Sequence, residues 1–138
     1  MDFYLDPNNT YERLKEEYLQ YGKLIIAVDY DDTLYDFHKK GRTYDDVINL
    51  LRRWENYSEI IIWTGNNSDK YEEINSYLQE HDIPFDGINY DAIVLSNSRK
   101  IYANAYLDDR AGLAEMYVIL NKLIDKIENG EIVYEEEK

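Results

Sequence analysis

The chain has 138 residues, and its 29 acidic and 15 basic side chains give a net charge of −14. A surface this negative repels phosphate backbones and anionic lipids, which excludes non-specific nucleic-acid coating and a polybasic membrane anchor. Hydrophobic residues make up 44% of the chain, enough for a real core, so global disorder is excluded as well. Because the chain has no cysteine, disulfides, thiolate nucleophiles and cysteine-bound metals are also excluded.

Neither a secretory signal nor a membrane span is expected. The first residues are acidic and contain no apolar core behind a basic end. The longest apolar runs, 24–28 and 60–63, are far shorter than the roughly 20 residues that span a bilayer. We therefore expect a single domain over residues 1–138, located in the cytoplasm and without a membrane partner.

Helix and strand patterns alternate along the first part of the chain. Residues 1–22 form an N-terminal helical extension, in which Thr10 caps a helix that Gly22 ends. Residues 23–28 are apolar without alternation, which is typical of a strand covered on both faces in a parallel sheet. The expected elements are a helix over 11–21, a strand over 23–28, a helix from Thr43 to about 57, a strand over 59–63 and a helix from Ser68 to about 80.

The second part of the chain predicts two further strands and a long helix. The third strand lies either at 85–88 or at 92–95, and the fourth covers 104–107. Apolar residues then recur at spacings of three and four over 113–127, and Gly130 ends that helix. Residues 131–138 form an acidic tail or, through 132–134, a final edge strand.

This alternation predicts an α/β fold of right-handed βαβ units. We expect a three-layer, Rossmann-like open parallel sheet of about five strands with helices on both faces. In such sheets the working site lies beyond the carboxyl ends of the strands. There the first strand ends at Asp29, the second at Thr64 and Gly65, and the fourth at Asp108 and Asp109, all at the same edge.

The acidic residues at this edge predict a metal site. Asp29 and Asp31 stand two apart where the first strand ends, and ionised carboxylates are costly to bury unless they are paired or bind a metal. Asp108 and Asp109 add negative charge to Asp29 and Asp31. These carboxylates would repel one another and raise one another's pKa values unless a hard cation neutralised them. Mg²⁺ prefers such oxygen ligands, and Lys100 would complete an anion clamp suited to phosphoryl transfer.

Three segments carry a resemblance to a known family. In order and spacing, IIAVDYDDTL (25–34), IIIWTGN (60–66) and SRKIYANAYLDDRAG (98–112) resemble the four motifs of the haloacid dehalogenase (HAD) superfamily of phosphohydrolases. The insertion points that hold cap domains in this superfamily carry only residues 34–42 and a 64–100 stretch with one helix. The chain is therefore most similar to the small capless hydrolases of bacteria and phages, and no cap domain is expected.

The resemblance implies a role for each matched residue. Asp29 is implied as the nucleophile that forms an aspartyl-phosphate, and Asp31 as the general acid and then base. Thr64, Gly65 and Lys100 are implied to bind the phosphate. Mg²⁺ is implied to be bound by Asp29, Asp108, Asp109 and the carbonyl of Asp31. Thr33 is implied to brace the loop. Asp32 departs from the pattern, because this position is often Gly in the family, and it adds a negative charge.

Several alternatives stay open at this point. The aspartates could instead be strand-end helix caps, and Arg99 competes with Lys100 for its role. The basic patch His38, Lys39, Lys40 and Arg42 either contacts the phosphate side of the substrate or is a solvated loop that offsets the negative charge.

The expected activity is Mg²⁺-dependent phosphomonoester hydrolysis. The expected partner is a phosphorylated substrate, either a small molecule such as a nucleotide or a nucleic-acid 3′-phosphate end. The alternatives are a sugar-phosphate phosphatase and a catalytically retired HAD-fold binding or regulatory module, and a homo-oligomer remains open. A phospho-accepting receiver needs an acidic pair at the first strand and a lone phospho-accepting Asp at a later one. It is disfavoured because here Asp29-x-Asp31 comes first and the Asp108–Asp109 pair last. An acidic nuclease fits poorly with the negative charge.

Overall fold

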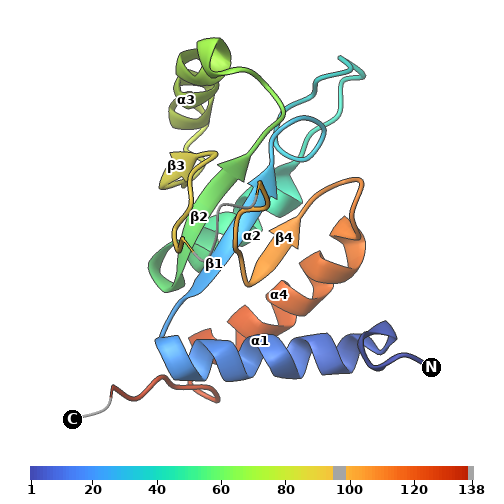
Figure 1. Ribbon diagram of the computed structural model, residues 1–138, viewed down its shortest axis with the longest axis vertical. Coiled ribbons are helices and arrows are strands. Elements are labelled where there is room, and N and C mark those ends of the chain that lie inside the picture. Colours follow the sequence, from blue (N-terminus) through green and yellow to red (C-terminus); the bar gives the residue numbers. More distant parts are fainter. Residues whose placement is uncertain (95–98, 137–138) are drawn as a thin grey trace.

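The computed structural model describes residues 1–94 and 99–136. These residues form four α-helices and one four-stranded sheet, and helix and strand alternate up to β3 (Figure 1). In chain order the elements are α1 (Pro7–Tyr21), β1 (Leu24–Asp29), α2 (Asp45–Trp54), β2 (Ser58–Trp63), α3 (Tyr71–Glu80), β3 (Gly87–Ile88), β4 (Ala105–Leu107) and α4 (Leu113–Glu128), with short 3₁₀ helices at Phe3–Leu5, Glu55–Tyr57 and Ser68–Lys70.

The sheet is parallel throughout, in the order β3-β2-β1-β4. β1 is central, pairing with β2 from Leu24 to Asp29 and with β4 from Ile26 to Val28. β2 and β3 extend the sheet on one side of β1, and β4 lies on the other side. Connections that run in these two directions must pass over opposite faces of the sheet to stay right-handed. The predicted open parallel α/β sheet is confirmed, with four strands where about five were expected.

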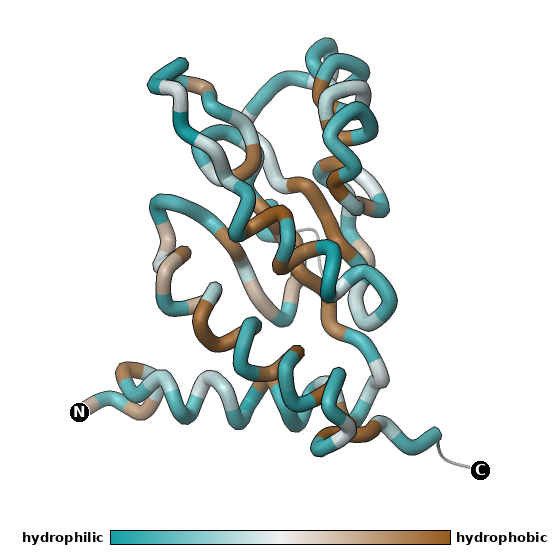
Figure 2. The backbone as a smooth tube through the Cα atoms, turned by 180° about the vertical axis from the view of Figure 1, so that it is seen from behind, coloured by the Kyte–Doolittle hydropathy of each residue, from teal (hydrophilic) through white to brown (hydrophobic). Residues whose placement is uncertain are grey.

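The two faces of the sheet are packed by different parts of the chain. Leu24, Ile26 and Val28 point into a large apolar cluster that also holds the buried residues of all four helices. Ile25 and Ala27, which alternate with them, point into a second cluster with residues of the segment between β3 and β4. Figure 2 shows the hydrophobic strands inside and the hydrophilic helix surfaces outside. The pattern of a strand buried on both faces is thus confirmed. Helices on both faces were also expected, but in the described part of the chain the buried helix residues pack on one face, and the segment between β3 and β4 covers the other without a helix.

Helix α1 begins earlier than its sequence pattern predicts. Asp6, not Thr10, is its N-cap, because the Asp6 carboxylate accepts the Asn8 N–H at 3.0 Å and Pro7 occupies the first turn. The predicted end is confirmed: Gly22 adopts φ 78° and its N–H donates to the Tyr18 carbonyl.

Other predicted boundaries shift by a few residues. The third strand is at Gly87–Ile88, inside the first of the two predicted ranges, and residues 92–94 form no strand, whereas residue 95 lies outside the described residues. Residues 132–134 form no edge strand, although Ile132 is buried in the large cluster. Ser68 opens a 3₁₀ turn, and the α-helix begins only at Tyr71.

In the part of the chain that the structure describes, no helix is both long and apolar enough to cross a bilayer.

Candidate active site at the carboxyl edge of the sheet

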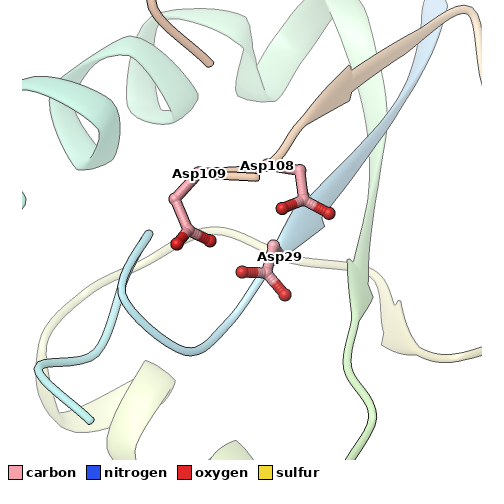
Figure 3. A group of neighbouring side chains, drawn as sticks. All are labelled: Asp29, Asp108 and Asp109. Carbon is pink, nitrogen blue, oxygen red and sulfur yellow. The ribbon is translucent and has the colours of Figure 1, made fainter. Parts of the chain in front are cut away.

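Neighbouring strands bring three carboxylates together. Val28 pairs with Leu107, so the next residues, Asp29 and Asp108, leave β1 and β4 side by side, and Asp109 follows. One carboxylate oxygen from each of the three lies within 4.8 Å of the others. Figure 3 shows the three carboxylates turned toward a common space beyond the strand ends. This edge is where ligands bind in open α/β sheets.

Ionisation of Asp29 is disfavoured within this group. Burial, a hydrogen bond with Asp109, and the charges of Asp108 and Asp109 together raise the pKa of Asp29 to about 7, and a hydrogen bond from Thr33 partly opposes them. The three converging carboxylates form an oxygen-rich donor set of the kind that a hard divalent cation neutralises. The chemistry of the residues therefore fits Mg²⁺.

Thr33 ties the acidic group to the loop that follows β1. Its side chain is fully buried, and its Oγ1 accepts the backbone N–H of Asp109 at 3.2 Å. The same oxygen lies 3.3 Å from a carboxylate oxygen of Asp29 and 3.3 Å from one of Asp109. Because a hydroxyl has one proton, it donates to one of these carboxylates at a time. Thr33, for which the resemblance implies a bracing role, thus contacts both Asp29 at the end of β1 and Asp109 in the loop after β4.

The carboxylate of Asp31 lies outside the three-carboxylate group. Its Oδ2 accepts a hydrogen bond from the Asn66 amide at 3.3 Å. Burial, followed by the charges of Asp32 and Asp109, raises the pKa of Asp31 although the Asn66 hydrogen bond lowers it. A raised pKa keeps more of this carboxyl protonated near neutral pH, which is what a general acid requires.

Thr64 follows β2 and is buried, with its hydroxyl held by Asn66. Its Oγ1 accepts both the backbone N–H of Asn66, at 3.1 Å, and the Asn66 side-chain amide, at 2.7 Å. With both lone pairs engaged, the hydroxyl proton is directed to a further acceptor. Asn66 thus links Thr64 to Asp31.

Asn89 holds the backbone of Thr64. The Thr64 N–H donates to Asn89 Oδ1 at 2.8 Å, and Asn89 Nδ2 donates to the Thr64 carbonyl at 2.7 Å. Asn89 itself has a φ of 48° just beyond β3, in the left-handed region that Asn tolerates better than most residues. Its amide therefore continues the pairing of β2 with β3 by one more residue.

Asn66 and Asn89 are the two site residues that the sequence analysis missed. Asn66 lies inside the quoted 60–66 segment, so its position two residues after Thr64 was a usable signal. Asn89 lies 25 residues beyond Thr64, and only the pairing of β2 with β3 brings them together.

Asp32 stands in the backbone conformation that explains why its position favours glycine. Its φ is 59°, and its N–H donates to the Tyr35 carbonyl at 2.7 Å in the tight turn after β1. Asp is among the residues that adopt this left-handed conformation most readily apart from Gly. Its carboxylate accepts a hydrogen bond from Nδ1 of His38, a residue of the basic patch, at 2.5 Å.

The segment 34–42 is a flap organised by one carboxylate. Asp36 accepts the backbone N–H groups of Lys40, Gly41 and Arg42 at 3.2, 2.8 and 3.2 Å. The four basic side chains of the patch are exposed on this flap.

Lys100 and Gly65 lie at the periphery of the site. Lys100 is exposed, its Nζ is 5.7 Å from the centre of the Tyr106 ring, and it lines a pocket of about 480 Å³ together with Asp108. Gly65 is exposed, and a Cβ added to it would meet nothing within 4 Å, so the space in front of this backbone is open to a ligand.

Comparison with known proteins adds a likeness of fold. No family model matches the chain, and no curated protein matches it either. The chain is similar to a solved structure of a conserved protein from Bacteroides thetaiotaomicron, with a TM-score of 0.60 and 21% sequence identity. The match covers 83% of this chain and 99% of that one. At this identity the likeness establishes the α/β fold alone.

Proposed function

We propose that this chain is a Mg²⁺-dependent phosphomonoester hydrolase that works through an aspartyl-phosphate, as its resemblance to HAD phosphohydrolases implies. The observation that carries the proposal is the convergence of Asp29, Asp108 and Asp109 at the carboxyl edge of the sheet. Asp31, with its raised pKa, stands two residues from the proposed nucleophile but outside this group.

Asp29, Asp108 and Asp109 would hold the metal, together with the carbonyl oxygen of Asp31. Bound there, Mg²⁺ would neutralise the carboxylates and the phosphoryl oxygens. Thr33 supports this set, because its hydroxyl contacts two of the three carboxylates and the backbone of Asp109. A ligand set held by such outer contacts keeps its orientation when a substrate arrives.

In the first step Asp29 attacks phosphorus with one carboxylate oxygen. A bond forms between that oxygen and phosphorus, and the bond from phosphorus to the oxygen of the substrate alcohol breaks. Asp31 gives its proton to the departing oxygen, which leaves as a neutral alcohol. The raised pKa of Asp31 supports its role as the donor in this step.

In the second step water regenerates the enzyme. Asp31, now ionised, takes a proton from a water molecule whose oxygen attacks the phosphorus of the aspartyl-phosphate. The bond between phosphorus and the Asp29 oxygen breaks, inorganic phosphate leaves, and the Asp29 carboxylate is restored. The two steps together consume one water for each ester hydrolysed.

Phosphoryl oxygens would be held by the Thr64 hydroxyl, the backbone at Gly65 and the ammonium group of Lys100. The Thr64 proton is available for such a bond, because Asn66 fills both lone pairs of its oxygen. These donors give a local positive field inside a chain whose net charge of −14 repels anions elsewhere. We place this activity in the cytoplasm, on nucleotides or nucleic-acid 3′-phosphate ends, with sugar phosphates as the alternative substrates.

Release of inorganic phosphate from p-nitrophenyl phosphate tests the proposal. We expect turnover with Mg²⁺ and none with EDTA, and a loss of at least about a thousandfold in kcat for Asp29→Asn, because the nucleophile is removed. The matched control is Asp2→Asn, which makes the same change at an exposed aspartate ahead of α1 and should leave kcat unchanged. Equal rates for Asp29→Asn and the unmodified chain would refute the proposal.

A further inference from the structure

A pocket of about 330 Å³ opens beside Asp31, between the loop that follows β1 and helix α3. Asp31 and Asn66 lie at one side of it, and four aromatic residues make up much of the rest: Tyr30, Tyr35, Phe37 and Tyr77. Its volume is within the range of about 300–1,000 Å³ that is usual for small-molecule sites. The mechanism proposed above uses only Asp31 and Asn66 of this lining.

Three of the aromatic rings, those of Tyr30, Tyr35 and Tyr77, pack against one another. Tyr30 and Tyr35 are stacked, with their ring centres 5.2 Å apart and an interplanar angle of 6°. Tyr77 meets both edge-on, at 6.0 and 5.0 Å. Tyr30 is buried, whereas Tyr35 and Tyr77 are only partly buried, so the cluster is anchored in the core and still reaches the pocket.

Phe37 adds an exposed ring on the flap. More than half of its surface, 54%, is accessible to solvent although it lines the pocket. An apolar ring left exposed beside other rings offers surface on which a planar ring can stack.

The charges at the rim of the pocket compensate each other. Lys70 and Glu73 both line it, and their charged groups lie 3.9 Å apart. Asp31 is the remaining acidic residue of the lining, so the pocket has aromatic surface and no excess of positive charge that would bind a second anion. A neutral planar ring fits this lining better than a second phosphate or a polyhydroxylated sugar does.

We propose that this pocket holds the leaving group of the substrate, and that this group carries a planar aromatic ring, as in a nucleoside or an aryl-substituted alcohol. The inference rests on the proposed function, because Asp31 is there the acid that protonates the leaving oxygen, and the pocket begins at that carboxyl. The substrate class is accordingly a phosphomonoester of an aromatic-ring alcohol.

Two matched substrate pairs test the inference. Uridine 5′-monophosphate is compared with ribose 5-phosphate, and 2-phenylethyl phosphate with 2-cyclohexylethyl phosphate, so that each pair shares its leaving hydroxyl type and differs in the aromatic ring. We expect kcat/KM to be at least about fivefold higher for the aromatic member of one or both pairs, since stacking of one base on an aromatic side chain is worth about 1–3 kcal/mol. The pair with the larger ratio tells whether the ring is a nucleobase or an aryl group.

Variants of Phe37 locate that preference in the pocket. Phe37→Ala should lower kcat/KM for the aromatic member about fivefold or more and lower it clearly less for the non-aromatic member, and Phe37→Tyr should retain the preference. Phe3→Ala is the matched control, because Phe3 is a similarly exposed ring ahead of α1. Ratios near one for both pairs, or an equal loss on both members in Phe37→Ala, would overturn the inference while leaving the phosphatase proposal intact.

Failure of the proposed function is distinguished by a binding measurement. If neither p-nitrophenyl phosphate nor any member of either pair releases phosphate, the proposed hydrolase activity is wrong. Calorimetric titration of the four compounds into Asp29→Asn with Mg²⁺ then tests ligand binding in the pocket independently of turnover. Tighter binding of the aromatic members that Phe37→Ala removes would support an aromatic site, and its absence would overturn the inference as well.

Discussion

At the scale of single residues, the surroundings of Asp29 oppose its negative charge. It ends β1 beside Asp108 and is hydrogen-bonded with Asp109, and burial together with these neighbours raises its pKa to about 7. Without a cation, the folded chain therefore binds a proton here that the unfolded chain has already lost. This difference makes the stability of the metal-free protein depend on pH.

The sign of that dependence follows from the two pKa values. Between about pH 4, where Asp29 ionises in the unfolded chain, and about pH 7, where it ionises in the folded chain, the folded state holds more protons, so stability falls as the pH rises. In EDTA we expect Asp29→Asn to gain stability relative to the unmodified chain across this window and the gain to level off above it. Urea denaturation at pH 4.5, 6, 7 and 8 measures the difference, and a difference independent of pH would contradict it.

Asp32 shows how a departure from a motif can still satisfy its geometry. The resemblance places Gly where this chain has Asp32, and the φ of 59° there is the reason that Gly is usual. Asp adopts the same conformation at a modest cost, and here its carboxylate also engages His38. The turn after β1 is therefore retained with a different residue.

At the scale of elements, Thr64 depends on the short pairing of β2 with β3. β3 has only two residues, and the side-chain amide of Asn89 extends the pairing by bonding to both the N–H and the carbonyl of Thr64. These two bonds hold the backbone from which the proposed phosphate-binding hydroxyl projects. Loss of the Asn89 amide should therefore lower the stability of the protein and loosen the backbone that positions the Thr64 hydroxyl.

We expect Asn89→Gly to lower the free energy of unfolding by about 1–3 kcal/mol, because it leaves buried partners without a hydrogen bond while glycine keeps the positive φ. The matched control is Asp82→Gly, an exposed residue that has a φ of 53° and should change stability by no more than about 0.5 kcal/mol. Urea denaturation measures both variants. Equal losses would show that backbone flexibility, and not the Asn89 amide, is responsible.

At the scale of the whole molecule, the chain has a net charge of −14 and, in addition, a cluster of three aspartates at one edge of the sheet. Screening by salt should stabilise the chain generally, because it weakens the repulsion among surface carboxylates. A bound divalent ion should add a separate contribution that depends on the three converging aspartates. The two effects can be distinguished at equal ionic strength.

We expect MgCl₂ to raise the melting temperature more than NaCl of the same ionic strength, with a stabilisation of about 2.7 kcal/mol when free Mg²⁺ is a hundred times its dissociation constant. Asp108→Asn should remove the extra effect and keep the response to NaCl. Asp2→Asn, an exposed aspartate outside the acidic group, is the control and should retain both. Identical melting curves in the two salts would contradict a specific cation site.

Apolar periodicity and strand-end residues were sufficient to predict much of the fold and of the site. Runs buried on both faces identified β1 and β2, and parallel strands necessarily end at one edge, so Asp29, Thr64 and Asp108 could be assigned to that edge. Helix boundaries were predicted less well, because Asp6 competes with Thr10 as a cap and local sequence does not decide between them.

The amino-acid sequence by itself determined the parallel α/β architecture and the acidic edge, because both follow from residue type and spacing along single strands. Only the tertiary structure decided which carboxylates converge, that Asp31 lies apart from them beside Asn66, that Asn89 holds Thr64, and that four aromatic residues line one pocket. These contacts join segments 25 or more residues apart, and their geometry depends on strand register and packing, which no local pattern encodes.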